Sequence, residues 1–242
     1  MLWPLNSYLL SKLDAEQRRR SSRIRRRAWL VTLRRMRSLS ECRRSEDGTP
    51  IDRYYVERFL ADNRDAISGK VLEIGESRYS ARFGSALRSV DVLDIDGSNP
   101  QATIVADLAA ADAVADNTFD CIIATQTLRY IFEHRAAIRH LHRILRSPGT
   151  LLATVPAVSK MDAQRPDTDL WRYTPSSVRA LFAEAFGVEQ VSVASCGNLV
   201  SAIAFLAGMT AEELRAHELD RQDPDFPLIV AARCVKPQPH QP

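Results

Sequence analysis

Polar residues and a glycine follow three successive apolar runs in the middle of the chain. Gly75 follows the run 71–74, Asp96 follows the next run twenty-one residues later, and a third run ends at Asp107. The carboxyl ends of parallel strands meet at one edge of an open sheet, where ligands bind. A carboxylate after the second strand can accept both hydroxyls of a ribose. Asp107 can accept the exocyclic amine of an adenine while Leu108 packs against the ring, so the spacing predicts a nucleoside site.

Each of these residues also has a purely structural interpretation. Glu73 and Gly75 can form a tight turn between a strand and a helix. Asp94 is an alternative to Asp96 as the ribose acid, because Asp94 lies two residues earlier on the same strand face. We favour Asp96 because it ends the expected strand, and we note that Asp107 can also serve as a helix N-cap.

The fourth apolar run, 119–124, is followed by small polar residues. Thr125 and Gln126 stand where this strand would reach the same sheet edge. We expect both side chains to line the crevice. The alternative is that they form ordinary hydrogen bonds at the end of a strand.

Strands alternate with helices from Gly69 onward. Strands are expected at 71–74, 90–95, 102–105, 119–124, 151–155, 188–194 and 227–235, with a turn at 147–149. Helices are expected at 51–67, 78–88, 135–145, 175–186, 199–206 and 211–219. This alternation predicts an α/β fold of the Rossmann-like, doubly wound type, with a mostly parallel seven-stranded sheet and helices on both faces.

From Gly69 to Val155 the sequence resembles the class I S-adenosylmethionine-dependent methyltransferases. The matching segments are Glu73-Ile-Gly75 (motif I), Asp96 (the ribose acid), Asp107-Leu108 (the adenine motif), 119–127 (motif IV) and Ser147-Pro-Gly149 (the turn before strand five). The resemblance implies S-adenosylmethionine as the cofactor. It implies that the cofactor is bound by Glu73, Gly75, Tyr79, Asp96, Asp107, Leu108, Thr125 and Gln126. The sequence departs from motif I after Gly75, where Glu76, Ser77 and Arg78 stand in place of a glycine-rich loop.

More narrowly, the chain is similar to bacterial methyltransferase-domain proteins that often accompany glycosyltransferases. The shared segments are 48–55, 125–128, Phe182 with Phe186-Gly187, Gly197-Asn198 and 204–206. This likeness implies a sugar acceptor or a glycosyltransferase partner, and it extends the resemblance to residues 48–236.

Residues that follow strands four and five are candidates for acceptor contacts. Tyr130 and His134 follow motif IV, and Trp171 and Tyr173 follow strand five, where family members place such contacts. The alternatives are that His134 lies on the surface at a helix start and that the two aromatic residues pack a lid over the core. No catalytic residue is assigned, because in-line positioning carries much of methyl transfer.

No metal site is expected. His140 and His142 flank Leu141 without ligand spacing to a cysteine or carboxylate pair, and we interpret them as structural. The four cysteines are far apart and form no C-x-x-C pair, which is typical of a reducing cytoplasm. The first residues lack a basic n-region and a cleavage site, and no apolar run is long enough for a membrane span. We therefore expect a cytoplasmic protein.

The net charge of +3 is unevenly distributed. Residues 1–50 contain 13 Lys/Arg and 5 Asp/Glu, a charge of +8, whereas residues 51–242 contain 20 and 25, a charge of −5. We expect a basic, partly helical or disordered leader over 1–47, a methyltransferase-like domain over 48–236 and a disordered tail over 237–242. The leader is interpreted as a solvated extension, as a segment attracted to an anionic membrane surface or lipid-linked glycan, or as a nucleic-acid-binding arm.

The resemblance implies methylation of a small molecule or sugar, most readily on oxygen, and the sugar rests only on the likeness to proteins that accompany glycosyltransferases. The alternatives are a non-catalytic partner of a glycosyltransferase and a nucleic-acid methyltransferase guided by the leader. The Asn/Asp-Pro-Pro-Tyr/Phe signature of amino-group methylation is missing after strand four, which disfavours the nucleic-acid reading. A dinucleotide dehydrogenase is weaker still, since no G-x-G-x-x-G follows strand one.

Overall fold

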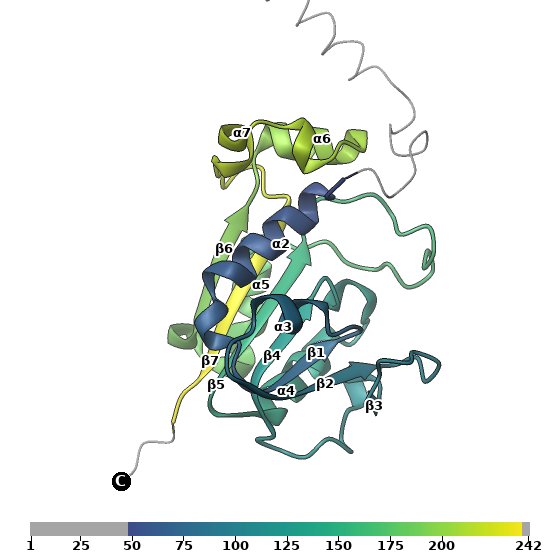
Figure 1. The fold of residues 1–242 in the computed structure, drawn as a ribbon, viewed down its shortest axis with the longest axis vertical. Coiled ribbons are helices and arrows are strands. Elements are labelled where there is room, and N and C mark those ends of the chain that lie inside the picture. The colour runs from purple at the N-terminus through teal and green to yellow at the C-terminus, as the bar shows by residue number, and fades with distance from the viewer. Residues whose placement is uncertain (1–47, 239–242) are drawn as a thin grey trace, which may run out of the picture. The chain divides into compact units, whose positions relative to one another are not determined.

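The centre of the structure is a seven-stranded sheet with the strand order β3-β2-β1-β4-β5-β7-β6 (Figure 1). The computed structural model describes residues 48–238, so the whole of the expected leader and the last four residues of the expected tail lie outside the described range. Strands β1 to β5 pair in parallel, and β7 runs antiparallel to both of its neighbours. The strands are β1 (Gly69–Ile74), β2 (Leu87–Asp94), β3 (Ile104–Val105), β4 (Phe119–Thr125), β5 (Leu145–Pro156), β6 (Val191–Cys196) and β7 (Ile229–Lys236). The expected fold class is confirmed.

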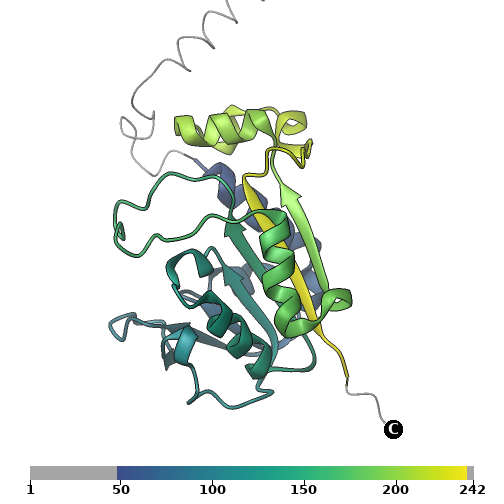
Figure 2. The same cartoon turned by 180° about the vertical axis from the view of Figure 1, so that it is seen from behind.

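Helices cover both faces of this sheet. Helices α2 (Ile51–Asp62) and α3 (Arg78–Phe83) lie in front of it in Figure 1, and α4 (His134–Ile144) and α5 (Pro175–Phe186) lie in front when the molecule is seen from behind in Figure 2. Successive strand residues alternate between the two cores, so Val71 packs with α2 while Leu72 packs with α4 and α5. The remaining helices are α6 (Leu199–Ala207), α7 (Ala216–Asp220) and the 3-10 turns η2 (Arg64–Ala66), η3 (Leu108–Ala110), η4 (Leu128–Tyr130), η5 (Val188–Gln190) and η6 (Ala211–Glu213).

Helix α5 has both boundaries that the sequence predicts. Thr174 accepts a hydrogen bond from the backbone N–H of Ser177, and the Ser177 hydroxyl completes a capping box with Thr174. Pro175 occupies the first helical position, where its missing N–H costs nothing. Gly187, at φ 87°, ends the helix.

Several other expected boundaries are wrong. The first helix ends at Asp62 and a 3-10 turn follows, α3 is six residues long, and β2 already begins at Leu87. The segment Ser147-Pro-Gly149 is part of the long strand β5 and not a separate turn. Strand β2 ends at Asp94, one residue before the expected end at 95 and two residues before Asp96. In residues 48–238, no helix combines the length and apolar character that crossing a membrane requires.

Candidate active site

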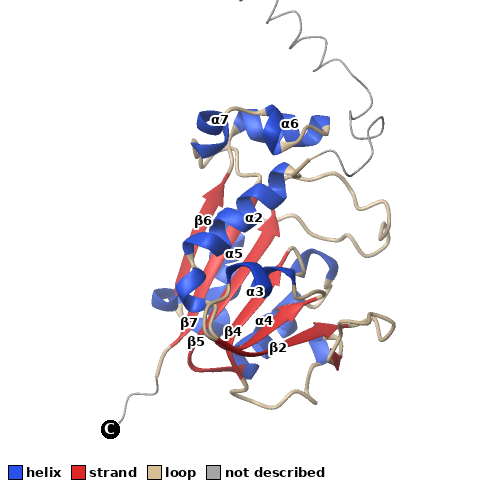
Figure 3. Cartoon of the chain, viewed as in Figure 1, coloured by secondary structure: helices blue, strands red, loops and turns tan. Residues whose placement is uncertain are grey.

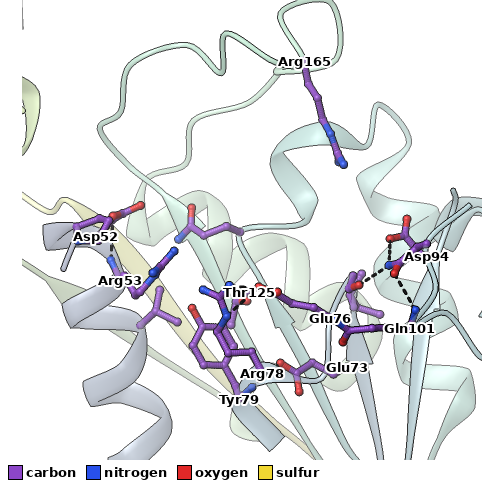
Figure 4. A pocket seen from close by; sticks show the side chains of 16 residues that line it. Asp52, Arg53, Glu73, Glu76, Arg78, Tyr79, Asp94, Gln101, Thr125 and Arg165 are labelled. Atoms are coloured by element: carbon purple, nitrogen blue, oxygen red, sulfur yellow. Dashed lines mark hydrogen bonds and ion pairs between the residues drawn. The ribbon is translucent and has the colours of Figure 1, made fainter. Parts of the chain in front are cut away.

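A cavity of about 560 Å³ lies at the carboxyl ends of β1, β2 and β4 (Figure 4). Its walls also include the first turn of α2 and the loop 157–174 between β5 and α5, which leaves the same end of the sheet (Figure 3). Ligand pockets typically have volumes of roughly 300–1,000 Å³ and occur at this edge of open α/β sheets. Of the expected cofactor residues, the cavity is lined by Glu73, Gly75, Tyr79, Thr125 and Gln126.

Gly75 shapes the floor of the cavity. Its φ is +88°, a conformation that side chains disfavour, and no atom lies within 4 Å of the position that a Cβ would occupy. Its N–H donates to the Leu93 carbonyl (2.9 Å), and its carbonyl accepts from Asn99 Nδ2 (2.6 Å). The glycine therefore permits the turn and leaves open space above it.

Glu73 fixes the loop that follows Gly75. The side chain is buried, and its two carboxylate oxygens accept the N–H groups of Tyr79 (2.8 Å) and Ser80 (2.9 Å) at the start of α3. Burial raises the pKa of this carboxyl group, while these hydrogen bonds favour its charged form. The structure thus gives Glu73 a definite role in holding the turn, in addition to its place in the cavity wall.

The acid that faces the cavity from β2 is Asp94, and Asp96 is not among the lining residues. Asp94 Oδ2 accepts from Asn99 Nδ2 (2.7 Å), while Oδ1 accepts the N–H of Asp96 (3.0 Å). The Asp96 carboxylate is exposed and accepts the N–H and hydroxyl of Ser98, and the N–H bond holds its pKa below the usual value. Because β2 ends at Asp94, the chain has already left the sheet when it reaches Asp96.

Side-chain amides bridge the turn that lacks the family's glycines. Gln101 Oε1 accepts both the N–H (3.1 Å) and the hydroxyl (3.3 Å) of Ser77. Asn99 links Gly75 to Asp94 and also accepts the N–H of Gln101 (3.0 Å) through Oδ1. The loop after β2 therefore holds the loop after β1 in place.

Thr125 and Gln126 line the cavity at the end of β4. Gln126 has a φ of +55°, which is uncommon for a residue with a side chain. Its N–H donates to the Thr154 carbonyl (2.7 Å), a bond that ties this unusual backbone to β5. Such strained residues cluster at functional sites.

Asp107 and Leu108 lie outside the cavity lining. Asp107 caps the 3-10 turn η3 by accepting the N–H of Ala109 (2.8 Å), and Leu108 is a buried core residue. In this structure Asp107 therefore forms the helix-cap hydrogen bond that its structural interpretation predicts.

The four expected acceptor residues are also absent from the cavity lining. Trp171 donates from Nε1 to the Ile131 carbonyl (3.0 Å), and the buried Tyr173 donates to the Leu128 carbonyl (3.0 Å). The His134 ring packs edge-on against both aromatic rings, and burial lowers its pKa. Together the three side chains pack the segment after β4 against the core, and Tyr130 holds the loop 157–174 through a hydrogen bond to Asp162 (2.9 Å).

Sequence reasoning missed Asp52, Arg53 and Arg165, all of which line the cavity. Asp52 and Arg53 are in the first turn of α2, a position that only the packing of this helix against the sheet brings to the strand ends. Asp52 is half-buried, and desolvation raises its pKa. Arg165 comes from a loop without periodicity, so no sequence signal pointed to it. Within the described range, no group of His, Cys, Asp and Glu side chains is arranged to bind a metal ion.

The strand order, the reversed β7 and a cavity where β1, β2 and β4 end define a class I methyltransferase-like fold. The family model for a methyltransferase domain matches residues 76–153. This match supports the expected resemblance to the class I S-adenosylmethionine-dependent methyltransferases, and with it S-adenosylmethionine as the cofactor. Among curated proteins, no sequence matches the chain.

Solved structures share the fold at low sequence identity. An S-adenosylmethionine-dependent methyltransferase from Archaeoglobus fulgidus is 12% identical, with a TM-score of 0.51 over 76% of this chain and 94% of that chain. A chain from a complex of the Haloferax volcanii Trm112 methyltransferase activator is 15% identical, with a TM-score of 0.50 over 77% and 94%. The [4+2]-cyclase SpnF is 18% identical, with a TM-score of 0.53 over 78% and 81%. At these identities the likeness establishes the fold alone.

Proposed function

We propose that this protein transfers the methyl group of S-adenosylmethionine to an oxygen of a small molecule or sugar. The observation that carries the proposal is the polar cavity at the sheet edge, with Asp94 at the end of β2 and Gly75 at the end of β1. The cavity suits the cofactor on three grounds. Gly75 leaves open space, Asp94 retains lone pairs beyond those used by Asn99 and Asp96, and the volume is that of a ligand pocket.

In this proposal Asp94 takes the ribose role that the sequence assigned to Asp96, and Arg53 faces the cofactor carboxylate. Thr125 and Gln126 form the wall beside the reacting centre. The bound cofactor supplies an electrophilic methyl group on a sulfonium. The protein's own contribution is to position the acceptor and to exclude water.

Asp52 is the proposed proton acceptor. A sugar hydroxyl is poorly acidic, so its methylation benefits from a general base. Asp52 lines the cavity, and in the described part of the chain it forms no ion pair. We expect Asp52→Asn to leave the affinity for S-adenosylhomocysteine unchanged and to lower the turnover of any hydroxyl acceptor; a variant with normal turnover would contradict this role.

The first test is calorimetric titration with S-adenosylmethionine and S-adenosylhomocysteine. We expect micromolar binding that Asp94→Asn weakens at least about tenfold, since a hydrogen bond to a charged group contributes about 1.5–3 kcal/mol. Asp96→Asn is the matched control and should bind normally. Equal losses in both variants would remove Asp94 from the proposal, and the lack of binding by the wild type at millimolar ligand would refute the enzymatic function.

Two alternatives come from other classes of protein. A non-catalytic methyltransferase-fold partner of a glycosyltransferase agrees with the glycine-poor turn after β1. The similar Haloferax volcanii chain comes from a complex with an activator, and the similar cyclase SpnF shows that this fold is compatible with another reaction. The second alternative, a nucleic-acid methyltransferase, is suggested only by the basic composition of the leader. This alternative requires that the protein binds RNA or DNA and that deletion of residues 1–47 abolishes the binding.

A further inference from the structure

Two arginine side chains face the cavity without forming an ion pair within residues 48–238. Arg53 reaches it from α2, and Arg165 extends toward it from the loop 157–174 (Figure 4). The third arginine of the lining, Arg78, differs because its guanidinium pairs with Glu76 (3.1 Å). A guanidinium is always charged, and its fork of donors matches carboxylates and phosphates.

Four acids line the cavity, and within residues 48–238 none of them forms an ion pair with Arg165: Glu76 pairs with Arg78, and Asp52 is the chain neighbour of Arg53. Glu73 is engaged by the N–H groups at the start of α3, and Asp94 is engaged by Asn99 and by the N–H of Asp96. The methionine part of the cofactor carries a single carboxylate. With Arg53 beside Asp52 and facing the cofactor carboxylate, Arg165 remains for a second anion, which the cofactor does not supply.

The position of Arg165 is prepared by its neighbours. Two guanidinium groups lie near the Tyr130 ring, with the Arg129 carbon 5.0 Å and the Arg165 carbon 5.7 Å from its centroid. The Tyr130 hydroxyl donates to Asp162 (2.9 Å), which lies on the same loop as Arg165. Cation–π attraction to the anchored Tyr130 thus helps to position Arg165, which lines the cavity.

The two arginines lie on different walls. In Figure 4, Arg53 stands near Tyr79, across the cavity from Asp94, whereas Arg165 approaches from the loop. A ligand that extends along the strand ends from Asp94 would direct its far end toward Arg53. Arg165 is then left for the molecule that enters under the loop.

We infer that the acceptor carries an anionic group, a carboxylate or a phosphate, and that Arg165 binds this group. The inference rests on the proposed function and adds the chemical class of the acceptor. An anionic sugar such as a uronate or a sugar phosphate combines the expected hydroxyl with the expected charge.

The test uses simple anions as probes and does not depend on knowing the acceptor. Sodium phosphate and sodium acetate are titrated calorimetrically, in a chloride-free buffer, into the full chain with and without saturating S-adenosylhomocysteine. We expect a millimolar anion site that persists when the cofactor product is bound. Arg165→Gln should weaken it at least tenfold, and Arg165→Lys should retain part of the affinity.

The matched control is Arg139→Gln, since Arg139 is an exposed arginine of α4 that does not line the cavity. An anion site that Arg165→Gln leaves intact, or no anion site in the cofactor-bound protein, would overturn the inference. If S-adenosylhomocysteine fails to bind, the proposed function fails, and the titration of the free protein still decides whether Arg165 binds anions.

Stronger binding of phosphate or of acetate identifies the type of anion. Turnover is then compared between glucose 6-phosphate, glucuronate and glucose, and turnover of glucose alone would also overturn the inference.

Discussion

At the scale of single residues, the site depends on backbone conformations as much as on charged groups. Gly75 and Gln126 directly follow β1 and β4, have positive φ values of 88° and 55°, and both line the cavity. A left-handed residue turns the chain sharply away from the sheet. The turns at Gly75 and Gln126 therefore direct the following loops away from the cavity.

Replacement of Gly75 by alanine should affect both the stability of the fold and the affinity for the cofactor. The Cβ meets no neighbouring atom, so the expected cost is the left-handed conformation alone, about 1–2 kcal/mol of unfolding free energy. The new methyl group also projects into open space, and we expect weaker binding of S-adenosylhomocysteine. Urea unfolding and calorimetry measure the two quantities.

Gly97→Ala is the control for this experiment. Gly97 is in the loop after β2, and its added Cβ would make an ordinary contact of 3.6 Å with Val105. We expect little change in either quantity. If Gly75→Ala bound S-adenosylhomocysteine with wild-type affinity, the space above Gly75 would not be part of the cofactor site.

At the scale of elements, the loop 157–174 is anchored by a buried carboxylate. Asp169 accepts hydrogen bonds from the guanidinium groups of Arg129 and Arg172 and from the backbone N–H of Asp162 (2.8 Å). Its side chain is fully buried, and the two arginines, Arg172 first, hold its pKa well below the usual range. The anchor joins the loop that carries Arg165 to η4, which follows β4.

We expect Asp169→Asn to reduce the unfolding free energy by about 3–5 kcal/mol at pH 7, because it leaves buried charge uncompensated. A depressed pKa stabilises the fold at pH values above the pKa of the unfolded chain, about 3.9. The difference between wild type and variant should therefore be constant from pH 8 to 5 and shrink as the pH falls below about 4. Urea unfolding at pH 7, 5 and 3.5 measures it.

The exposed Asp167 of the same loop provides the comparison, and Asp167→Asn should unfold like the wild type at each pH. If the difference in unfolding free energy between wild type and Asp169→Asn were the same at pH 3.5 as at pH 7, the stabilisation would not depend on the charge of Asp169. An Asp169→Asn variant as stable as the wild type would show that the loop is held by other contacts.

The elements also show which features could be predicted from sequence. Helix α5 was predicted over 175–186 from its opening proline, and its ends agree with the structure because they depend on local residues, the cap Thr174, Pro175 and Gly187. Asp94 and Asp96 share the period-two pattern of one strand face, so the pattern could not decide between them. In the structure Asp94 lines the cavity and Asp96 does not, because β2 leaves the sheet after Asp94, where Asn99 and Gln101 hold the next loop against the end of β1.

The remaining site residues required the tertiary structure. Asp52 and Arg53 reach the cavity only because α2 packs across the sheet, and Arg165 only because Tyr130 and Asp162 hold its loop. Trp171 and Tyr173 were predicted from the family's usual placement of acceptor contacts. Here their polar atoms donate to the backbone carbonyls of Ile131 and Leu128.

At the scale of the whole molecule, charge divides the chain into two parts. Residues 1–50 carry +8 and the remainder −5. All residues that line the cavity lie between Pro50 and Arg165, and the two buried clusters of the described range extend from Ile51 to Cys234. Cofactor binding and attraction to anionic surfaces should therefore belong to different parts of the chain.

Deletion of residues 1–47 should leave the Kd for S-adenosylhomocysteine within about twofold of the full-length value, because every residue of the cavity is retained. The same deletion removes 13 basic and 5 acidic residues, so it should abolish any binding to anionic vesicles or to single-stranded RNA that weakens as salt is added. Calorimetry measures the first quantity, and vesicle sedimentation and RNA titration at 50 and 200 mM salt measure the second.

Binding to vesicles alone would support a membrane-directed leader, and binding to RNA alone would support the nucleic-acid alternative. Loss of cofactor affinity in the deletion variant would contradict the division, since it would mean that the basic segment contributes to the active site.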